Sequence, residues 1–398
     1  MKFVNKISMI VLVGVLSIAM FGGVVFAQPV SPLICKGDIY PFSSNIVSAH
    51  SASIEVLPNG DLFATWFAGS REGARDVDIY GARKISGQLF WSKPEIVVAS
   101  KPDHSAGNST LWYDNETDKL WLFYVIEEGT NWEEAVVKRM YSTDLGLTWS
   151  EPIYVREEWG WMSGTDLVEL SNGDLLLPLY DEGGLSGPKW SCMFYISEDR
   201  GDTWAVYPED RQLTSPEGMI QADVVELEPG HLLMYARTRD AWVYKSESTD
   251  FGRTWSKSEK TDIPNNTARL CLEKLDSGAL ALVYNPVPKV WGPRNPLRVA
   301  LSYDNGVTWP YMKDIENGPA LAEYSYPWLT QGPDGNLHIA YTFRRTRIRY
   351  AKLNEAWIIS GEDLRVPTQP YSKKDELALF KAGVSYLPYT CFEGSDVE

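Results

Sequence analysis

The side chains available for chemistry in this sequence are mainly carboxylates, arginines and tyrosines. There is no glycine-rich phosphate loop, no Gly-x-Ser-x-Gly elbow and no His-Glu-x-x-His pair, and the chain has only four histidines. Acidic residues number 53 against 37 basic ones, so the formal net charge is −16. This balance disfavours binding to nucleic acid or to an anionic membrane surface. An anionic ligand would therefore need a local pocket of basic side chains.

A repeated motif indicates what kind of scaffold positions these groups. The pattern Ser-x-Asp-x-Gly-x-Thr-Trp, called the Asp-box below, begins at Ser142, Ser197, Ser248 and Ser302, and a worn copy without the Asp begins at Ser86. Short Asp and Ser side chains bond free backbone N–H groups and Gly adopts positive φ, which suits a tight hairpin turn. The boxes recur about every 50 residues, a period typical of supersecondary units that stack to bury a core.

A second series of turns precedes apolar runs that are typical of buried strands. These turns are Pro58-Asn59-Gly60, Glu116-Thr117-Asp118, Ser171-Asn172-Gly173, Pro229-Gly230, Ser277-Gly278 and Pro333-Asp334-Gly335. Two kinds of turn that alternate at this spacing predict six four-stranded blades. We therefore expect an all-β fold, a six-bladed β-propeller with Asp-box hairpins. In such a fold the innermost strands bring their loops to one central depression, where distant residues can converge.

The two ends of the chain differ from the repeats. Residues 1–27 are typical of a secretory signal, with a basic start, an apolar run and small residues before Gln28. An uncleaved anchor is the alternative, because the apolar run is nearly long enough to span a bilayer. We assign residues 28–360 to the propeller and 361–398 to a tail that packs on it, with a helix at 373–381. The mature protein is expected to be secreted, without a membrane span, and monomeric.

The four cysteines, Cys35, Cys192, Cys271 and Cys391, match no zinc-binding spacing. In an oxidising compartment, Cys35 and Cys391 are candidates for a disulfide that ties the two ends of the ring together. Free buried thiols are the alternative. We expect neither a metal nor another cofactor.

The Asp-boxes, the six blades and several loop segments resemble the sialidase (neuraminidase) superfamily, and more closely its secreted members with bacterial neuraminidase repeats. The resemblance covers roughly residues 45–355. It implies three arginines that clamp the carboxylate of sialic acid, since guanidinium groups suit planar, bidentate recognition. It also implies a Tyr nucleophile activated by a Glu, and an Asp acid/base on a mobile loop. The implied activity is an extracellular glycoside hydrolase of exo-α-sialidase type, acting on glycans with a terminal acidic sugar.

The resemblance assigns site residues segment by segment. In the segment 69–79, Arg71 and Asp76 match a substrate-binding arginine and the acid/base aspartate, with Asp78 as a competing carboxylate. Arg237, which follows a strand pair, matches the second clamp arginine.

Two later segments supply the remaining site residues that the resemblance implies. Arg294, which runs into the Asp-box at Ser302, matches the third clamp arginine. Tyr324 matches the family's tyrosine by the serine that follows it, whereas Tyr326 matches by its distance to the next turn. We favour Tyr326 as the catalytic tyrosine.

Two positions depart from the family pattern. The Tyr-activating Glu falls on Gln221, and Glu217 could replace it only if the loop bends differently. A Gln can orient a phenol but cannot accept its proton at neutral pH. The first clamp arginine falls on His50, which could bind an anion or exchange protons. These departures put the covalent route of the family in question, so that Asp76 and His50 would have to activate water or abstract a proton.

Two other readings therefore stay open beside the hydrolase. His50, a Tyr and an Arg could abstract a proton beside a uronate carboxylate, which would make the protein a polysaccharide lyase. Alternatively, the propeller binds acidic glycans without turnover. An unsaturated, ultraviolet-absorbing product would distinguish the lyase, and binding without turnover would distinguish the third reading.

Overall fold

The computed structural model describes most of the chain, namely residues 30–40, 46–100, 102, 104–182, 190–208, 213–319, 321–361 and 390–393. The described residues from Ser31 onward belong to one compact unit. The signal expected at 1–27 and the helix expected at 373–381 lie outside the described residues, as does most of the tail assigned to 361–398. In the described part of the chain, no helix has the length and apolar character needed to cross a membrane.

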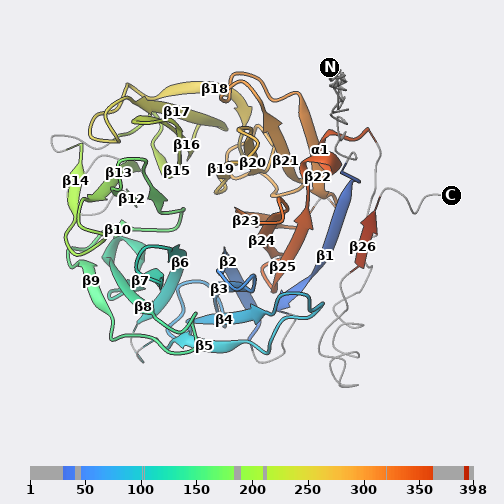
Figure 1. Ribbon diagram of the computed structural model, residues 1–398. Coiled ribbons are helices and arrows are strands. Elements are labelled where there is room, and N and C mark those ends of the chain that lie inside the picture. Colours follow the sequence, from blue (N-terminus) through green and yellow to red (C-terminus); the bar gives the residue numbers. More distant parts are fainter. Residues whose placement is uncertain are drawn as a thin grey trace, which may run out of the picture. The chain divides into compact units, whose positions relative to one another are not determined.

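Six antiparallel sheets, numbered here as blades in chain order, surround a central axis (Figure 1). Blades 1 and 2 contain β2 (Ser48–Val56), β3 (Leu62–Gly69), β4 (Asp78–Lys84), β5 (Glu95–Val98), and β6 (Ser105–Asp114), β7 (Lys119–Glu127), β8 (Ala135–Ser142), β9 (Ile153–Arg156). Blades 3 and 4 contain β10 (Trp161–Met162), β11 (Val168–Glu169), β12 (Leu175–Asp181), β13 (Ser191–Ser197), β14 (Ala205–Tyr207), and β15 (Met219–Glu228), β16 (His231–Thr238), β17 (Trp242–Ser248), β18 (Glu259–Pro264). Blade 5 contains β19 (Cys271–Lys274), β20 (Leu280–Tyr284), β21 (Leu297–Ser302) and β22 (Tyr311–Glu316). The predicted six-bladed β-propeller is therefore confirmed.

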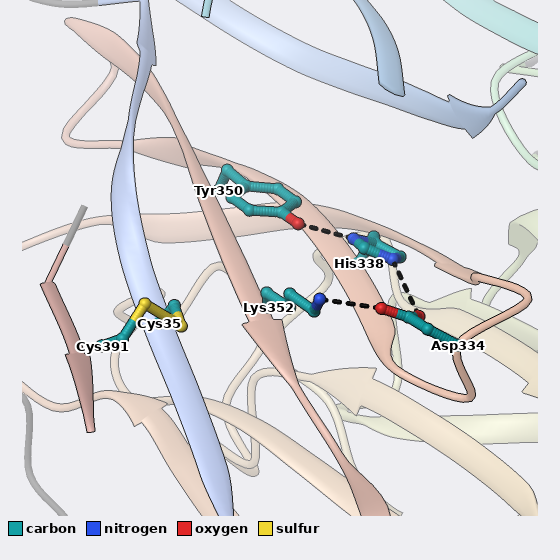
Figure 2. The surroundings of a disulfide bond; sticks show 6 residues. All are labelled: Cys35, Asp334, His338, Tyr350, Lys352 and Cys391. Atoms are coloured by element: carbon teal, nitrogen blue, oxygen red, sulfur yellow. Dashed lines mark hydrogen bonds and ion pairs between the residues drawn. A yellow bond between two sulfur atoms is a disulfide. The ribbon is translucent and has the colours of Figure 1, made fainter. Parts of the chain in front are cut away.

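Blade 6 closes the ring with strands from both ends of the described chain. Its order is β23 (Tyr324–Gln331), β24 (Leu337–Phe343), β25 (Arg347–Leu353), β1 (Leu33–Tyr40) and β26 (Thr390–Glu393). Cys35 of β1 faces Cys391 of β26 and forms a disulfide with it (Figure 2). The proposed Cys35–Cys391 pairing is thus confirmed, while the other two cysteines are free and buried.

Two short helices were not expected from the sequence. A 3-10 helix, η1 (Trp132–Glu134), lies between β7 and β8. An α-helix, α1 (Glu355–Ile359), follows β25, and the Asn354 side chain caps it by accepting from the N–H of Trp357. Both are too short to show the hydrophobic periodicity by which helices are recognised in a sequence.

The Asp-boxes form the turns between the third and the outer strand of blades 2 to 5, as expected. In the first box, Asp144 accepts from the N–H and the hydroxyl of Thr148, and Ser142 accepts from the N–H of Gly146. The box tryptophans pack between blades, as Trp255 does with its ring centroid 4.4 Å from that of Phe194. The boxes therefore stabilise the outer hairpins.

A separate apolar layer fills the space between neighbouring blades. Between blades 3 and 4, for example, Leu176 of β12 packs with Leu232 of β16, and both are fully buried. Gly252 of the third Asp-box has a φ of +83°, and a Cβ there would lie 2.6 Å from a methyl carbon of Leu176. Only glycine fits this turn without strain. Each layer fixes the angle between two blades and so the position of their inner strands.

The innermost strands share an unusual backbone conformation. In or just before the inner strand of each blade, one residue at a corresponding place has a φ between 41° and 147°. These residues, called the axial ring below, are Ser51, Asn108, Gly164, Gln221, Thr267 and Tyr326. The pairing registers of β2, β6, β15 and β23 shift at this point, which marks β-bulges. Positive φ in residues other than glycine is uncommon and concentrates at functional sites.

On the side of the axial ring towards which the inner strands run lies an acidic pocket of about 440 Å³. Glu55, Asp166 and Glu273 line it, and Asp223 lies close enough to interact electrostatically with Asp166 and Glu273. Burial, and next the charge of Asp223, raise the pKa of Glu273 to about 8. Burial likewise raises the pKa of Glu55 to about 8 and that of Asp223 to about 6. Among the described residues, no cluster of acidic, His or Cys side chains is arranged to hold a metal ion.

We expect this acidic pocket to make stability fall as the pH rises. Since the folded pKa of Glu273 lies above the ~4.3 of an unfolded glutamate, unfolding releases a proton between about pH 4 and pH 8, and the free energy of unfolding falls across this range. Glu273→Gln should raise the free energy of unfolding at pH 8 by about 1–2 kcal/mol, because the pocket admits water that reduces the full linkage effect. Urea unfolding at pH 5 and pH 8 measures this. Exposed Glu259→Gln is the control, and an unchanged pH dependence in E273Q would contradict the expectation.

Candidate active site

A cluster of aromatic and basic side chains surrounds Tyr326 near the propeller axis. Arg237 of β16 donates through Nη1 to the Tyr326 hydroxyl at 2.5 Å. The His50 ring of β2 lies with its centroid 4.1 Å from that of Tyr326, and the guanidinium carbon of Arg294 lies 5.1 Å from the same ring. The structure therefore brings together four residues that the sequence analysis selected from four different blades.

Arg345 is a fourth basic member of this cluster, and the sequence analysis missed it. It lies between β24 and β25, and its Nε donates to Glu323 Oε1 at 2.8 Å; Arg294 donates to the same oxygen at 2.9 Å. Its carbonyl oxygen accepts from the N–H of Ala49, the residue before His50. Arg345 therefore lies beside His50, the position where the resembling family has its first clamp arginine. Two adjacent arginines at a strand-to-strand turn were the only signal available in the sequence.

His50 is fully buried and, within the described part of the chain, leaves one of its two ring nitrogens unpaired. Its Nδ1 contacts the Thr342 hydroxyl at 2.8 Å, and its Nε2 has no hydrogen-bond partner among the described residues. Burial holds the pKa of His50 well below its ordinary value, and nearby guanidinium groups lower it further. These groups belong, in order of effect, to Arg345, Arg294, Arg269 and Arg237. The imidazole is therefore neutral at pH 7 and has an unused ring nitrogen.

Among the described residues, Gln221 makes no hydrogen bond to Tyr326, the contact that the family pattern implied. It lies in the β-bulge of β15 with a φ of 54°, and its Nε2 donates to the Tyr180 hydroxyl at 3.3 Å. Glu217 is exposed, and Glu323 bonds Arg294 instead. In the described part of the chain, no carboxylate contacts the Tyr326 hydroxyl. A direct carboxylate base for this phenol is therefore missing.

The loop after β3 presents a different carboxylate from the one expected. Asp76 is exposed, and its carboxylate accepts from the N–H and the hydroxyl of Ser70, so the loop folds back on itself. Arg71 is also exposed, and neither residue contacts the cluster around Tyr326 in the described structure. Glu72 does reach it, through an ion pair with Arg345. The number of residues that separates a carboxylate from Arg71 does not predict that Glu72 reaches the cluster, because the turn inside the loop decides which side chain points inward.

Tyr324 lies outside the cluster, which corrects its assignment as a candidate catalytic residue. Its ring is fully buried in the layer between blades 5 and 6, 5.0 Å from that of Phe343. Its hydroxyl approaches Gly318 on the outer side of β23. The β-bulge that follows Ser325 gives Tyr326 a different direction. Of the two tyrosines, Tyr326 is the one that the fold brings to the axis.

The arrangement is suited to binding an anionic, oxygen-rich ligand. Arg237, Arg294 and Arg345 provide planar donors near Tyr326, and the Nε of Arg237 is buried without a partner among the described residues. A pocket of about 320 Å³, lined by Arg294, Arg345 and Trp291 among others, adjoins them. Guanidinium groups fixed in this way recognise carboxylates in bidentate fashion. A neutral imidazole and a phenol beside a bound carboxylate can exchange protons with it.

Comparisons with known proteins identify the family and the fold of the chain. A family model described as "BNR repeat-like domain" matches residues 60–339. A sialidase from Bacteroides fragilis is 24% identical over 269 residues, which is 58% of this chain and 48% of that protein. An anhydrosialidase from Macrobdella decora is 25% identical over 266 residues, 62% of this chain and 33% of that protein. The chain thus spans half or less of the length of these curated relatives.

Solved structures show the same fold. A Hadza microbial sialidase superposes with a TM-score of 0.69 at 20% identity, covering 81% of this chain and 69% of that one. The intramolecular trans-sialidase from Ruminococcus gnavus superposes with a TM-score of 0.66 at 16% identity, covering 82% of this chain and 99% of that one. At this identity the likeness establishes the propeller.

Proposed function

Because the chain belongs to the BNR repeat-like domain family, within the sialidase superfamily, we propose that it is a glycoside hydrolase that releases a terminal acidic sugar from glycans. The observation that carries this proposal is the cluster of Arg237, Arg294 and Arg345 near Tyr326, in which Arg294 and Arg345 share the carboxylate of Glu323. Three guanidinium groups beside a phenol can form a site for a sugar carboxylate. The exo-α-sialidase type of activity is the form of this function that the relatives favour.

The proposal includes location outside the cytoplasm. The disulfide between Cys35 and Cys391 supports it, because such bonds persist in oxidising compartments. The signal-like residues 1–27 support it as well. We propose a secreted protein on these two grounds.

A second candidate function is favoured by the state of His50. Its unpaired Nε2, next to Tyr326, could remove the proton on the carbon that bears a uronate carboxylate. The electron pair of that C–H bond would form a C=C bond as the neighbouring C–O bond breaks, and the leaving oxygen would take a proton from Tyr326. The arginines would stabilise the charge that develops on the carboxylate. This reaction is the β-elimination of a polysaccharide lyase.

One experiment separates these functions. The purified protein is incubated with a panel of sialosides and of uronate glycosides, and the products are identified. A free acidic sugar without ultraviolet absorption supports the hydrolase, and an unsaturated, ultraviolet-absorbing product supports the lyase. Binding without turnover indicates an acidic-glycan-binding propeller, and neither binding nor turnover on the whole panel contradicts the proposal.

The clamp predicts a strong effect at Arg345. Arg345→Ala should lower kcat/KM by about 10²–10³-fold, as loss of a charge-assisted contact to the substrate carboxylate removes about 3–4 kcal/mol. The methyl ester of the same substrate should lose far less, since it has no carboxylate charge. Steady-state kinetics on both substrates measure the difference. Arg344→Ala, which removes the exposed neighbour, is the matched control. Equal losses on acid and ester would contradict the clamp.

A further inference from the structure

A directed chain of hydrogen bonds starts at the axis of the propeller and ends in the active site. Arg269, which is 1% exposed, donates through Nη1 to the Ser51 hydroxyl at 3.2 Å. Because a guanidinium group only donates, the Ser51 oxygen must accept this bond. Its own proton then goes to Oδ1 of Asn108 at 2.9 Å. Arg269 therefore fixes which way the Asn108 amide faces.

The next link reaches Tyr180 on blade 3. With Oδ1 of Asn108 turned to Ser51, its Nδ2 donates to the Tyr180 hydroxyl at 2.8 Å. Gln221 donates to the same hydroxyl from the other side at 3.3 Å. The Tyr180 oxygen thus accepts two bonds, and its proton has no acceptor in the described part of the chain.

Turning the Gln221 amide over does not remove this unused donor. Tyr180 would then donate to the amide oxygen of Gln221, which is otherwise buried without a partner. The Gln221 NH₂ group would in turn be left with nothing to donate to. In both orientations the Tyr180–Gln221 pair keeps a buried donor without an acceptor. A buried donor without an acceptor costs about 1–3 kcal/mol, and an oxygen atom of a ligand could accept this hydrogen bond.

The unused donor lies beside the catalytic cluster. Tyr180 is 2% exposed and packs with Trp190, whose ring also lies 5.0 Å from the guanidinium carbon of Arg237. Tyr180 interacts electrostatically with Tyr326 and Arg237. It therefore lies in the neighbourhood of Tyr326 and Arg237, on a strand of blade 3.

We propose that Tyr180, held by Asn108 and Gln221, binds a non-carboxylate oxygen of the acidic sugar, and so makes the enzyme specific for a sugar with oxygen at that carbon. The inference rests on the proposed function, because it assumes that the arginines bind the carboxylate of the same sugar. Tyr180 acts as a hydrogen-bond donor and not as an acid. Burial, and next the charge of Glu182, raise the pKa of Tyr180 far above its ordinary value, so the phenol keeps its proton.

The specificity follows from the cost of an unmet donor. A sugar that lacks this oxygen would leave Tyr180 buried and unpaired in the complex, and sites of this kind reject such analogues strongly. A sugar that has the oxygen accepts a hydrogen bond from Tyr180, so that no donor stays unpaired in the complex. Tyr180→Phe should therefore remove the discrimination between the two sugars.

The test measures binding of N-acetylneuraminic acid, D-glucuronic acid and their monodeoxy analogues by calorimetry. For the parent sugar that the wild type binds, Tyr180→Phe is expected to lower the affinity by about 10- to 100-fold. One monodeoxy analogue, which lacks the oxygen that Tyr180 binds, should have the same affinity for the wild type and for Y180F. Tyr235→Phe is the matched control, since it removes a buried hydroxyl that bonds the Gly306 carbonyl far from the site. Y235F should bind every sugar as the wild type does.

The possible failures can be told apart. Unchanged affinity for the parent sugar in Y180F overturns the inference and leaves the proposed function standing. Equal weakening for the parent and all its analogues also overturns it, because this result shows a structural role of the hydroxyl. If the wild type binds none of the acidic sugars, the proposed function fails and the inference fails with it.

Discussion

Replacing His50 with asparagine is expected to lower kcat by about 10²–10⁴-fold, the usual contribution of a general base. The Tyr326 hydroxyl contacts Arg237 and no carboxylate among the described residues, so the phenol lacks the proton acceptor used by the resembling family. His50 is the neutral group beside it with a free ring nitrogen. Asparagine can still bond Thr342 but cannot accept a proton. Steady-state kinetics on the substrate found in the panel measure the loss.

The dependence of kcat/KM on pH also tests His50 as the base. The base must be neutral, and burial among arginines holds the pKa of His50 well below its ordinary value of 6.5. The kcat/KM of the wild type should therefore stay constant as the pH falls through 6.5, and should decline only at a more acidic pH. His338→Asn is the control, because His338 bonds Tyr350 in blade 6 away from the cluster (Figure 2). H50N activity within tenfold of the wild type would contradict a base at His50.

A trapping experiment tests the competing route through Tyr326. In the resembling family, a fluorinated sialosyl analogue accumulates a covalent adduct on the tyrosine. We expect no stable adduct here, because His50 is expected to take a proton from water or from the sugar, and a phenol that keeps its own proton is a poor nucleophile. Mass spectrometry of the treated protein measures it. A stable adduct on Tyr326 would show that the covalent route is intact and would contradict this expectation.

The sequence predicted the blades because their turns have strict chemical requirements. Each Asp-box needs Ser, Asp and Gly at fixed spacing, so four boxes and their period were enough to infer the stacking of repeats. Ring closure was also predictable, because Cys35 and Cys391 are the two cysteines nearest the chain ends. Residues tied to a turn or to a strand end, such as Arg237 and Tyr326, could be placed by counting from these marks.

What could not be predicted depends on backbone direction. The axial ring contains Ser, Asn, Gly, Gln, Thr and Tyr, so no residue type marks the positive φ that sets where each side chain points. This conformation turns Gln221 to Tyr180 instead of Tyr326. It also separates Tyr326 from Tyr324, two residues apart in one strand. Arg345 was missed for a related reason, since it enters from a turn that the family pattern does not use.

Arg269→Met is expected to destabilise the protein by about 3–5 kcal/mol, the largest stability effect among these predictions. The side chain is fully buried inside the ring of blades and donates to acceptors from three of them. These acceptors are the Ser51 hydroxyl and the carbonyl oxygens of Ala52, Gly164, Tyr326 and Pro327. Methionine fills a similar volume and donates nothing, so five buried acceptors would lose a donor.

Two opposing effects decide the size of this loss. No carboxylate pairs directly with Arg269 in the described structure, so removing its charge relieves a desolvation cost. Against this, its charge favours the ionised forms of Asp166 and Asp223 in the acidic pocket, and the variant leaves them without that support. Five unmet acceptors outweigh the relief, because each costs about 1–3 kcal/mol when buried. The net effect is therefore destabilising.

Urea unfolding at pH 7 measures the change, with Arg298→Met as the matched control. Arg298 pairs with Asp314 near the surface of blade 5, so its loss should cost about 1 kcal/mol or less. R269M should also lower turnover per folded molecule, because Arg269 holds the Tyr326 carbonyl and with it the positive φ that directs the phenol into the site. If R269M unfolded at the same urea concentration as R298M and kept full turnover, the axial ring would not depend on this arginine. The orientation of Tyr326 would then have to come from the β-bulge of β23 alone.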